Sequence, residues 1–317
     1  MLEVIVTRKK TEAVDICSFE LALIDGGQLP PFTAGSHIDV YVAPGIVRQY
    51  SLCNTPGENH HYQIAVLLDA NSRGGSRGMH QEITEGQTLT ISEPRNLFPL
   101  AHAAAHTLLF AGGIGITPIL CMAERLHQTN ASFELHYSAR AAERAAFRQR
   151  INKSGFATSA SYYFDDTPSD SPLDMSKLLA NPTHDKHLYV CGPSGYMDFV
   201  IQSALKAGWH DGNIHREYFT ASADLHAGGS HFEVQVASSG KVFVIPEGQA
   251  ITEVLANAGI EIPVSCEQGV CGTCITRILE GEPEHRDVFL TNEEKALNDQ
   301  FTPCCSRAKT SRLVLDL

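Results

Sequence analysis

Four cysteines near the C-terminus have a spacing that few folds can accommodate. Three of them occur as CxxxxCxxC, and the fourth follows after 29 intervening residues. This spacing is typical of plant-type [2Fe–2S] ligation, in which four thiolates converge on two irons. One tight loop and one distant segment would then supply the metal ligands, which are Cys266, Cys271, Cys274 and Cys304.

The same cysteines could instead form a structural zinc site or a disulfide framework. Zinc sites usually use short-spaced pairs, and only one CxxC pair occurs here. Residues 1–15 alternate like a strand and lack a secretory signal, so we expect a reducing cytoplasm in which thiols stay free for iron. Cys305 directly follows Cys304, and neighbouring residues of an extended strand point to opposite faces, so only one of the two should reach the cluster.

Charge and hydropathy exclude two kinds of partner. The chain carries 24 Lys and Arg against 36 Asp and Glu, a formal net charge of -12 that would repel a nucleic-acid backbone. Residues 107–123 lack charge, but they are short for a membrane span and contain Gly-rich and Thr-Pro steps. We therefore predict no nucleic-acid partner and no membrane partner.

Residues 1–103 are rich in strand patterns. Six segments alternate or run apolar between turn residues: 2–7, 16–24, 37–42, 47–52, 62–68 and 89–93. They predict a small antiparallel β-barrel. A short helix is expected between the last two strands, and the glycines of RGGS (73–76) before it could receive a phosphate. Tyr50, in the RQYS motif (48–51), could lie against an aromatic ring.

Residues 104–222 alternate between strands and helices, which predicts a doubly wound parallel sheet. Helices are expected from Pro118 and over 142–149, 173–180 and 196–206. GGIGITP (112–118) and CGPSG (191–195) each follow a strand and open a helix, so both turns should meet at the carboxyl edge and could receive a pyrophosphate. Asp166 follows the third strand, where a carboxylate would accept a ribose hydroxyl and favour NADH over NADPH.

Residues 223–230 are rich in small residues and predict a linker before a cluster domain over 231–317. Taken in order, RQYS, RGGS, GGIGITP, CGP, REYF (216–219), the cluster loop, EGEPEHRD (280–287) and CCSRAK (304–309) resemble the phthalate dioxygenase reductase family across essentially the whole chain. The resemblance implies an FMN-binding barrel, a nicotinamide nucleotide domain and a C-terminal ferredoxin-like β-grasp domain.

The resemblance also implies roles for individual residues. The FMN ring and phosphate would be held by Arg48, Tyr50, Ser51, Ala65, Val66, Gly74, Gly75 and Ser76. The nicotinamide nucleotide would be held by Gly113, Thr117, Cys191, Gly192 and Pro193. Phe219 would lie where flavin and nicotinamide meet, although Tyr218 is adjacent. Cys304 fits the family position of the fourth cluster ligand.

Together these features predict an electron-transfer enzyme. Nicotinamide gives up two electrons as hydride and a [2Fe–2S] cluster accepts one at a time, so flavin is expected as the mediator. NADH would reduce FMN, and single electrons would pass through the cluster to a separate Rieske-type oxygenase, with no catalytic acid, base or nucleophile. A stand-alone NADH-dependent flavin, ferric or quinone reductase, and a non-enzymatic redox sensor or zinc-bound interaction module, remain alternatives.

Overall fold

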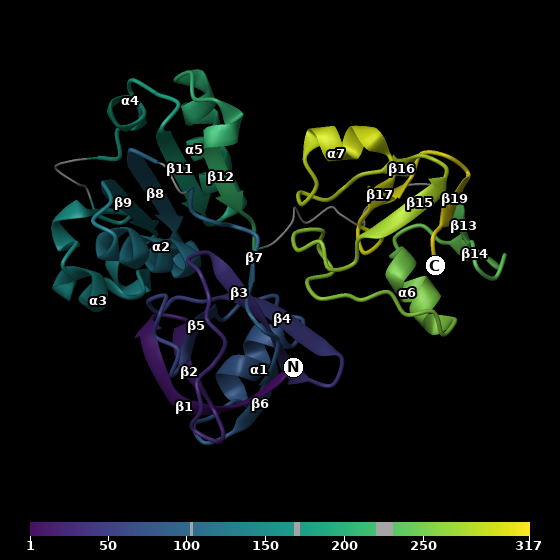
Figure 1. The fold of residues 1–317 in the computed structure, drawn as a ribbon, viewed down its shortest axis with the longest axis horizontal. Helices are drawn as coiled ribbons and strands as arrows, with labels where there is room; N and C mark the ends of the chain where they lie inside the picture. Colours follow the sequence, from purple (N-terminus) through teal and green to yellow (C-terminus); the bar gives the residue numbers. More distant parts are fainter. Residues whose placement is uncertain (102–103, 168–171, 220–230) are drawn as a thin grey trace. The chain divides into compact units, whose positions relative to one another are not determined.

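The computed structural model describes residues 1–101, 104–167, 172–219 and 231–317, arranged as two compact units. The first unit comprises Met1–Glu217 and the second Tyr218–Leu317 (Figure 1). The predicted linker, 223–230, lies outside the described residues. Among the helices that the structure describes, none combines the length and the apolar content needed to cross a membrane.

The first unit begins with an antiparallel, barrel-like sheet. Its strands are β1 (Leu2–Ala13), β2 (Ile16–Leu23), β3 (Ser36–Ala43), β4 (Ile46–Ser51), β5 (Tyr62–Leu67), β6 (Thr88–Ile91) and β7 (Arg95–Asn96). The order is β4-β3-β6-β1-β2-β5, and β7 pairs with β3. Alternating residues such as Val4 and Val6 are fully buried, which explains the period-two pattern of the sequence. The six predicted strands and the helix before the last, α1 (Gly75–Gln81), are confirmed.

A five-stranded parallel sheet completes the first unit. It consists of β8 (His106–Gly112), β9 (Phe133–Ala139), β10 (Ala160–Phe164), β11 (Lys186–Cys191) and β12 (Ile214–Glu217), in the order β10-β9-β8-β11-β12. Its helices are α2 (Ile116–Gln128), α3 (Arg148–Lys153), α4 (Met175–Leu178) and α5 (Ser194–Lys206). The order reverses between β8 and β11, so this is the predicted doubly wound sheet with its switch point at these two strands.

Two helix starts differ from the sequence prediction. Helix α2 begins at Ile116, so Thr117 and Pro118 lie inside its first turn. The helix expected over 142–149 is divided into a short 3₁₀ turn, Ala142–Arg144, and α3. Phe147 separates them because it adopts a left-handed conformation, φ 61°, with its side chain buried. Burial of this ring therefore overrides the helical pattern of the sequence.

The second unit is a β-grasp fold. Its strands are β13 (Phe232–Val236), β14 (Val242–Ile245), β15 (Thr276–Glu280), β16 (Pro283–Glu284), β17 (Gln300–Phe301), β18 (Arg307–Ala308) and β19 (Arg312–Leu315). The main sheet has the order β14-β13-β19-β15-β17, and β13 and β19 run parallel at its centre. Helix α6 (Ile251–Asn257) packs Ile251 and Leu255 into the core of this sheet, and α7 (Asn292–Leu297) follows the cluster loop.

Candidate functional site

The RQYS and RGGS motifs meet at the start of α1. Arg48 Nη2 donates a hydrogen bond to the carbonyl oxygen of Arg73, 3.1 Å away. A Cβ atom added to Gly75 would lie 2.5 Å from Arg48 Cγ and 2.7 Å from Nε, so only glycine leaves room for the arginine. Gly74 has φ 91°, which also favours glycine. A guanidinium beside a Gly-Gly-Ser helix start is an arrangement that can hold the phosphate of a flavin.

The other predicted flavin residues lie on β4 and β5, the two ends of the barrel strand order, which approach each other. Ala65 and Val66 are buried on β5, and burial raises the pKa of Tyr50 on β4, so its phenol stays neutral. Ser76 Oγ accepts a hydrogen bond from the backbone of Asp69. The predicted phosphate and ring residues therefore come from two strands that approach each other, β4 and β5, and from helix α1, which follows β5 in the chain.

Glu217 is a site residue that the sequence analysis missed. Ser51 Oγ donates a hydrogen bond to Glu217 Oε2 at 3.2 Å, which joins the barrel to the end of β12. Glu217 stands opposite Cys191 in the β11–β12 register and raises the pKa of the Cys191 thiol beyond the effect of burial. Burial raises the pKa of Glu217 itself to about 8. Its position could have indicated a site residue, because Glu217 directly precedes Tyr218 and Phe219 and lies at the carboxyl end of a predicted parallel strand.

The two glycine turns touch each other at the switch point of the parallel sheet. A Cβ atom on Gly115 would clash with the carbonyl oxygen of Cys191, and one on Gly192 would lie 2.9 Å from the Gly112 Cα. Gly113 has φ 54° and its Cβ direction is open, so backbone is accessible to a ligand there. Ligands of open α/β sheets bind at this edge, and the turns can therefore receive a pyrophosphate.

The remaining predicted nucleotide residues differ in how close they lie to these turns. Thr117 is buried and donates to the carbonyl oxygen of Ile114, so it shapes the first turn. Pro193 precedes α5 as its N-cap residue. Asp166 is exposed after β10, two strands from β8 in the sheet. Phe219 belongs to the second unit, and its place beside the flavin stays a prediction.

The four predicted metal-ligand thiols interact with one another. The interaction between Cys266 and Cys271 raises the pKa of Cys266 and lowers that of Cys271. Cys304 interacts with Cys274 and with Cys305, and these interactions together with burial raise the Cys304 pKa. Within the described part of the chain, no three His, Cys, Asp or Glu side chains are grouped so that they could hold one metal ion. Four cysteines at the plant-type spacing fit a [2Fe–2S] cluster better than a single zinc ion.

Cys305 interacts with Cys304 and also contacts the cluster loop. A Cβ atom on Gly269 would clash with Cys305 Sγ, and Gly269 has φ 69°. The Thr302 hydroxyl lies 3.3 Å from Cys305 Sγ. Cys304 interacts with both Cys274 and Cys305, so its assignment as the fourth ligand stays a prediction.

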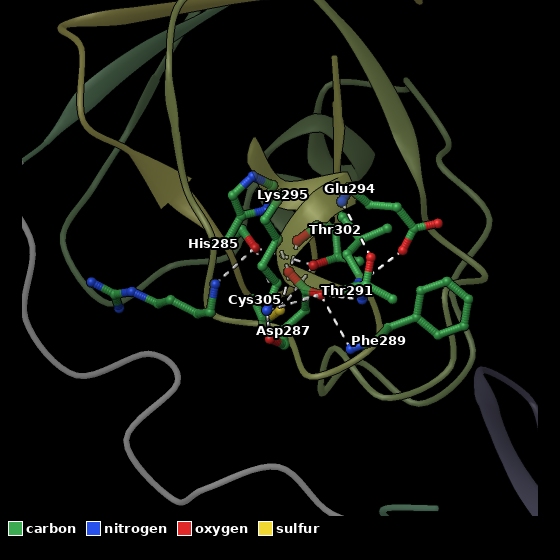
Figure 2. Close-up of polar contacts among 11 residues, drawn as sticks. His285, Asp287, Phe289, Thr291, Glu294, Lys295, Thr302 and Cys305 are labelled. Carbon is green, nitrogen blue, oxygen red and sulfur yellow. Dashed lines mark hydrogen bonds and ion pairs between the residues drawn. The ribbon is translucent and has the colours of Figure 1, made fainter. Parts of the chain in front are cut away.

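The segment after β16 supports the cluster loop (Figure 2). Asp287 Oδ2 accepts hydrogen bonds from the backbone N–H groups of Phe289 and Leu290, at 3.1 and 2.8 Å. Lys295 Nζ donates to the Asp287 carbonyl oxygen at 2.6 Å, which ties α7 to this turn. The backbone N–H of Val288 donates to Gly269. Asp287 therefore fixes the turn that contacts the loop carrying three of the four cysteines.

Comparisons with known proteins agree with these sites. Residues 234–309 match the family described as 2Fe-2S iron-sulfur cluster binding domain. The chain is 56% identical over 318 residues to vanillate O-demethylase oxidoreductase of Pseudomonas putida, with 100% of each chain covered. It is 42% identical to the phthalate 4,5-dioxygenase oxygenase reductase subunit of the same organism, covering 97% of this chain and 94% of that protein.

The arrangement of the fold also matches a solved structure. Phthalate dioxygenase reductase, described as a modular structure for electron transfer from pyridine nucleotides to [2Fe-2S], superposes with a TM-score of 0.78 at 39% identity. The match covers 100% of this chain and 98% of that one. A flavin-binding barrel, a nucleotide domain and a ferredoxin-like domain are thus the architecture shared along the full length.

Proposed function

The chain belongs to the phthalate dioxygenase reductase family, and from this premise we propose that it delivers electrons from NADH to a separate oxygenase with a Rieske centre. It is an oxidoreductase with flavin and [2Fe–2S] domains. The observation that carries the proposal is the full-length match to reductases of oxygenase systems, with a [2Fe–2S] domain over residues 234–309 that contains the four predicted ligand cysteines.

The residues of the first unit would bind and orient the two ring systems. Arg48, Gly74, Gly75 and Ser76 would hold the phosphate of FMN, while Tyr50, Ala65 and Val66 would contact its ring. Gly113, Thr117, Cys191, Gly192 and Pro193 would hold the dinucleotide, Asp166 would accept a hydrogen bond from its ribose, and Phe219 would lie at the junction of the rings. Ser51 and Glu217 supply a hydroxyl and a protonated carboxyl at that junction.

The bound groups supply the conversion of a two-electron donor into one-electron steps, which side chains cannot perform. The protein contributes position and electrostatics. Cys266, Cys271, Cys274 and Cys304 would hold the irons. We assign the flavin site to residues 1–103, the dinucleotide site to 104–222 and the cluster to 231–317, with the linker at 223–230.

The proposal extends to the type of oxygenase that accepts the electrons. Identity is 56% to the reductase of a vanillate O-demethylase and 42% to that of a phthalate dioxygenase. We therefore propose an oxygenase of the vanillate demethylating type as the acceptor, and the cytoplasm as the location, because cluster thiols need a reducing compartment.

The test is an anaerobic NADH titration of the purified protein, followed by absorbance, with the released flavin identified and iron counted. We expect FMN and about two irons per chain, both reduced by NADH. Cys304→Ser should lose the iron but keep reduction of the flavin, and the matched Cys305→Ser variant should keep both. A colourless protein, or one that contains zinc instead of iron, would contradict the proposal.

A further inference from the structure

Four side chains bridge the barrel and the parallel sheet within the first unit. Arg150 Nε donates to Glu124 Oε1 at 2.8 Å, and its Nη1 donates to Gln63 Oε1 at 2.8 Å. Thr55 Oγ1 donates to the other carboxylate oxygen, Glu124 Oε2, at 2.7 Å. We call Thr55, Gln63, Glu124 and Arg150 the Arg150 bridge. One charged pair thus bonds two barrel residues, of which Gln63 lies on β5 and Thr55 in the loop between β4 and β5.

The Arg150 bridge is fixed on both sides. On the barrel side, the Gln63 backbone N–H donates to Asn54 Oδ1, and the Cys53 N–H donates to the Gln63 carbonyl oxygen. On the other side, the Arg150 guanidinium lies 6.0 Å from the ring of Phe147, the buried residue whose left-handed backbone starts α3. Each partner therefore has little freedom to move independently.

Burial distinguishes this ion pair from an ordinary surface contact. The side chains of Arg150 and Glu124 are 29% and 17% exposed. The other ion pair between the same two parts, Arg144 with Asp15, is 43% and 45% exposed and spans 3.1 Å. Charge-assisted hydrogen bonds are stronger where water is excluded, and exposed pairs contribute little. The Arg150 bridge should therefore hold the two parts, and the Arg144 pair should not.

Both ends of the Arg150 bridge lead to a ligand site. Gln63 lies two residues before Ala65 on β5, and Thr55 lies four residues after Ser51 at the end of β4. Glu124 lies on α2, the helix that starts directly after the GGIG turn. A rigid helix and a paired strand thus connect the bridge to the predicted dinucleotide turn and to the predicted flavin wall.

We propose that the Arg150 bridge sets the distance between the flavin ring and the nicotinamide, so that Arg150 and Glu124 are positioning residues for hydride transfer. The proposal rests on the proposed function. Transfer between two bound rings depends steeply on their separation, and a displacement of about 1 Å can cost roughly 100-fold in rate. A bridge remote from both rings can therefore control the reaction without touching either.

The experiment compares Arg150→Met, Glu124→Ala, the double variant and Arg150→Lys in the full-length, flavin- and iron-loaded protein. Arg144→Gln is the matched control, since it removes the exposed ion pair between the same two parts. Anaerobic rapid mixing with NADH gives the limiting rate of flavin reduction and the apparent dissociation constant of NADH. Amide hydrogen exchange of β5 and α2, measured without NADH, reports on the bridge independently of activity.

We expect Arg150→Met and Glu124→Ala each to lower the limiting rate about tenfold, with nearly unchanged NADH and flavin affinity and faster exchange in β5. The double variant should lose no more than either single variant, because both remove one interaction. Arg150→Lys should recover part of the rate by keeping the charge, and Arg144→Gln should match the wild type.

Variants that exchange faster but reduce flavin at the wild-type rate would overturn the proposal and leave the Arg150 bridge a purely structural contact. Additive losses in the double variant would overturn it as well. If Arg150→Met releases flavin, Glu124→Ala decides, since it leaves the hydrogen bond from Arg150 to Gln63 on β5 in place. A wild-type flavin that NADH does not reduce would instead contradict the proposed function, so the two failures are distinguishable.

Discussion

Glu217 is a half-buried residue at the end of β12, and its carboxyl group accepts a hydrogen bond from Ser51 of the barrel. Burial raises its pKa to about 8, and the hydrogen bond from Ser51 opposes this shift only in part. At neutral pH the group is therefore mostly protonated, and it can donate as well as accept a hydrogen bond. A proton is thus held beside Ser51 and Cys191, at the predicted junction of flavin and nicotinamide.

Glu217→Gln should change how stability depends on pH. Below the ordinary pKa of 4.5, the wild-type carboxyl is protonated in both folded and unfolded chains, and there is no linkage. Between pH 4.5 and about 8 the unfolded chain releases this proton while the folded chain keeps it, so wild-type stability falls as pH rises. Glutamine cannot titrate, so thermal unfolding midpoints of the two proteins should diverge over this window.

The comparison should be made on flavin-free protein, in which ligand binding does not contribute to the midpoint. The unfolding midpoint of Glu217→Gln should rise relative to that of the wild type as the pH increases towards 8. Parallel curves between pH 5 and 8 would mean that the carboxyl ionises normally, and its role as a proton holder would be wrong.

Single residues were predictable where backbone shape or ligand chemistry restricts the choice. Gly75 was singled out from RGGS, and the structure shows that a side chain there would collide with Arg48. Glu217 was missed because its hydrogen-bond partner, Ser51, is 166 positions away in the chain. The local sequence does not indicate such long-range contacts, so it cannot distinguish a contacting acidic residue near a strand end from a solvated one.

At the scale of elements, a single lysine on strand β1 binds the C-terminal end of helix α1. Lys9 Nζ on β1 donates to the carbonyl oxygens of Met79, His80 and Ile83, at 3.2, 2.7 and 2.7 Å. The Met79 and His80 carbonyl groups belong to the last turn of the helix, whose carbonyls lack partners within the helix, and Ile83 follows just after it. Because α1 is only seven residues long, this lysine holds the helix start that is predicted to bind the flavin phosphate.

Lys9→Met should weaken flavin binding while the barrel stays folded. A cation at a helix C-terminus contributes about 0.3–1 kcal/mol, and up to about 2 kcal/mol when partly buried. We therefore expect the dissociation constant of FMN to rise roughly two- to thirtyfold. The measurement is a fluorescence titration of flavin-free protein with FMN.

The neighbouring residue provides the control. Lys10 forms an ion pair with Glu12 at 2.9 Å and points to solvent, so Lys10→Met should leave FMN affinity unchanged. Equal FMN affinities in the two variants would show that the contact of Lys9 with the end of α1 does not affect phosphate binding at the start of the helix.

The type of each element followed from sequence more reliably than its limits. The six barrel strands and the five parallel strands were expected from hydrophobic periodicity, which burial on one or both faces imposes. The division of 142–149 was not, because it depends on the buried ring of Phe147 rather than on local propensity. Tertiary packing decided the point where the helix begins.

At the scale of the whole molecule, the chain forms two compact units with a boundary after Glu217. Each has its own hydrophobic core, and the second is built around residues such as Phe232, Leu255 and Leu313. The boundary leaves the predicted flavin and dinucleotide turns in the first unit and all four cluster cysteines in the second.

A chain ending at residue 219 should therefore keep NADH-dependent reduction of its flavin and of ferricyanide, at a rate within about twofold of the full-length protein. It should lose electron transfer to cytochrome c and to a terminal oxygenase, because those acceptors need the iron–sulfur unit. Steady-state assays with each acceptor make the comparison. A truncated chain that still supplied the oxygenase at the full rate would favour a stand-alone reductase.

The fold class could be predicted from the sequence because the barrel, the parallel sheet and the cluster domain each have their own sequence pattern. Antiparallel alternation, strand–helix alternation and the cysteine spacing each predict one architecture. The Arg150 bridge was not predictable, since Arg150 and Glu124 have no motif and meet only after two elements pack. Contacts between modules are therefore the part that sequence patterns miss.

The buried lone cysteines carry a consequence for durability. Cys53, Cys121 and Cys191 are fully buried free thiols, and burial raises the pKa of each. Peroxide and alkylating reagents attack the thiolate, which these positions suppress. Oxidative damage should therefore begin at the cluster cysteines of the second unit. An aged preparation would lose its iron while the first unit, with its predicted flavin site, remained intact.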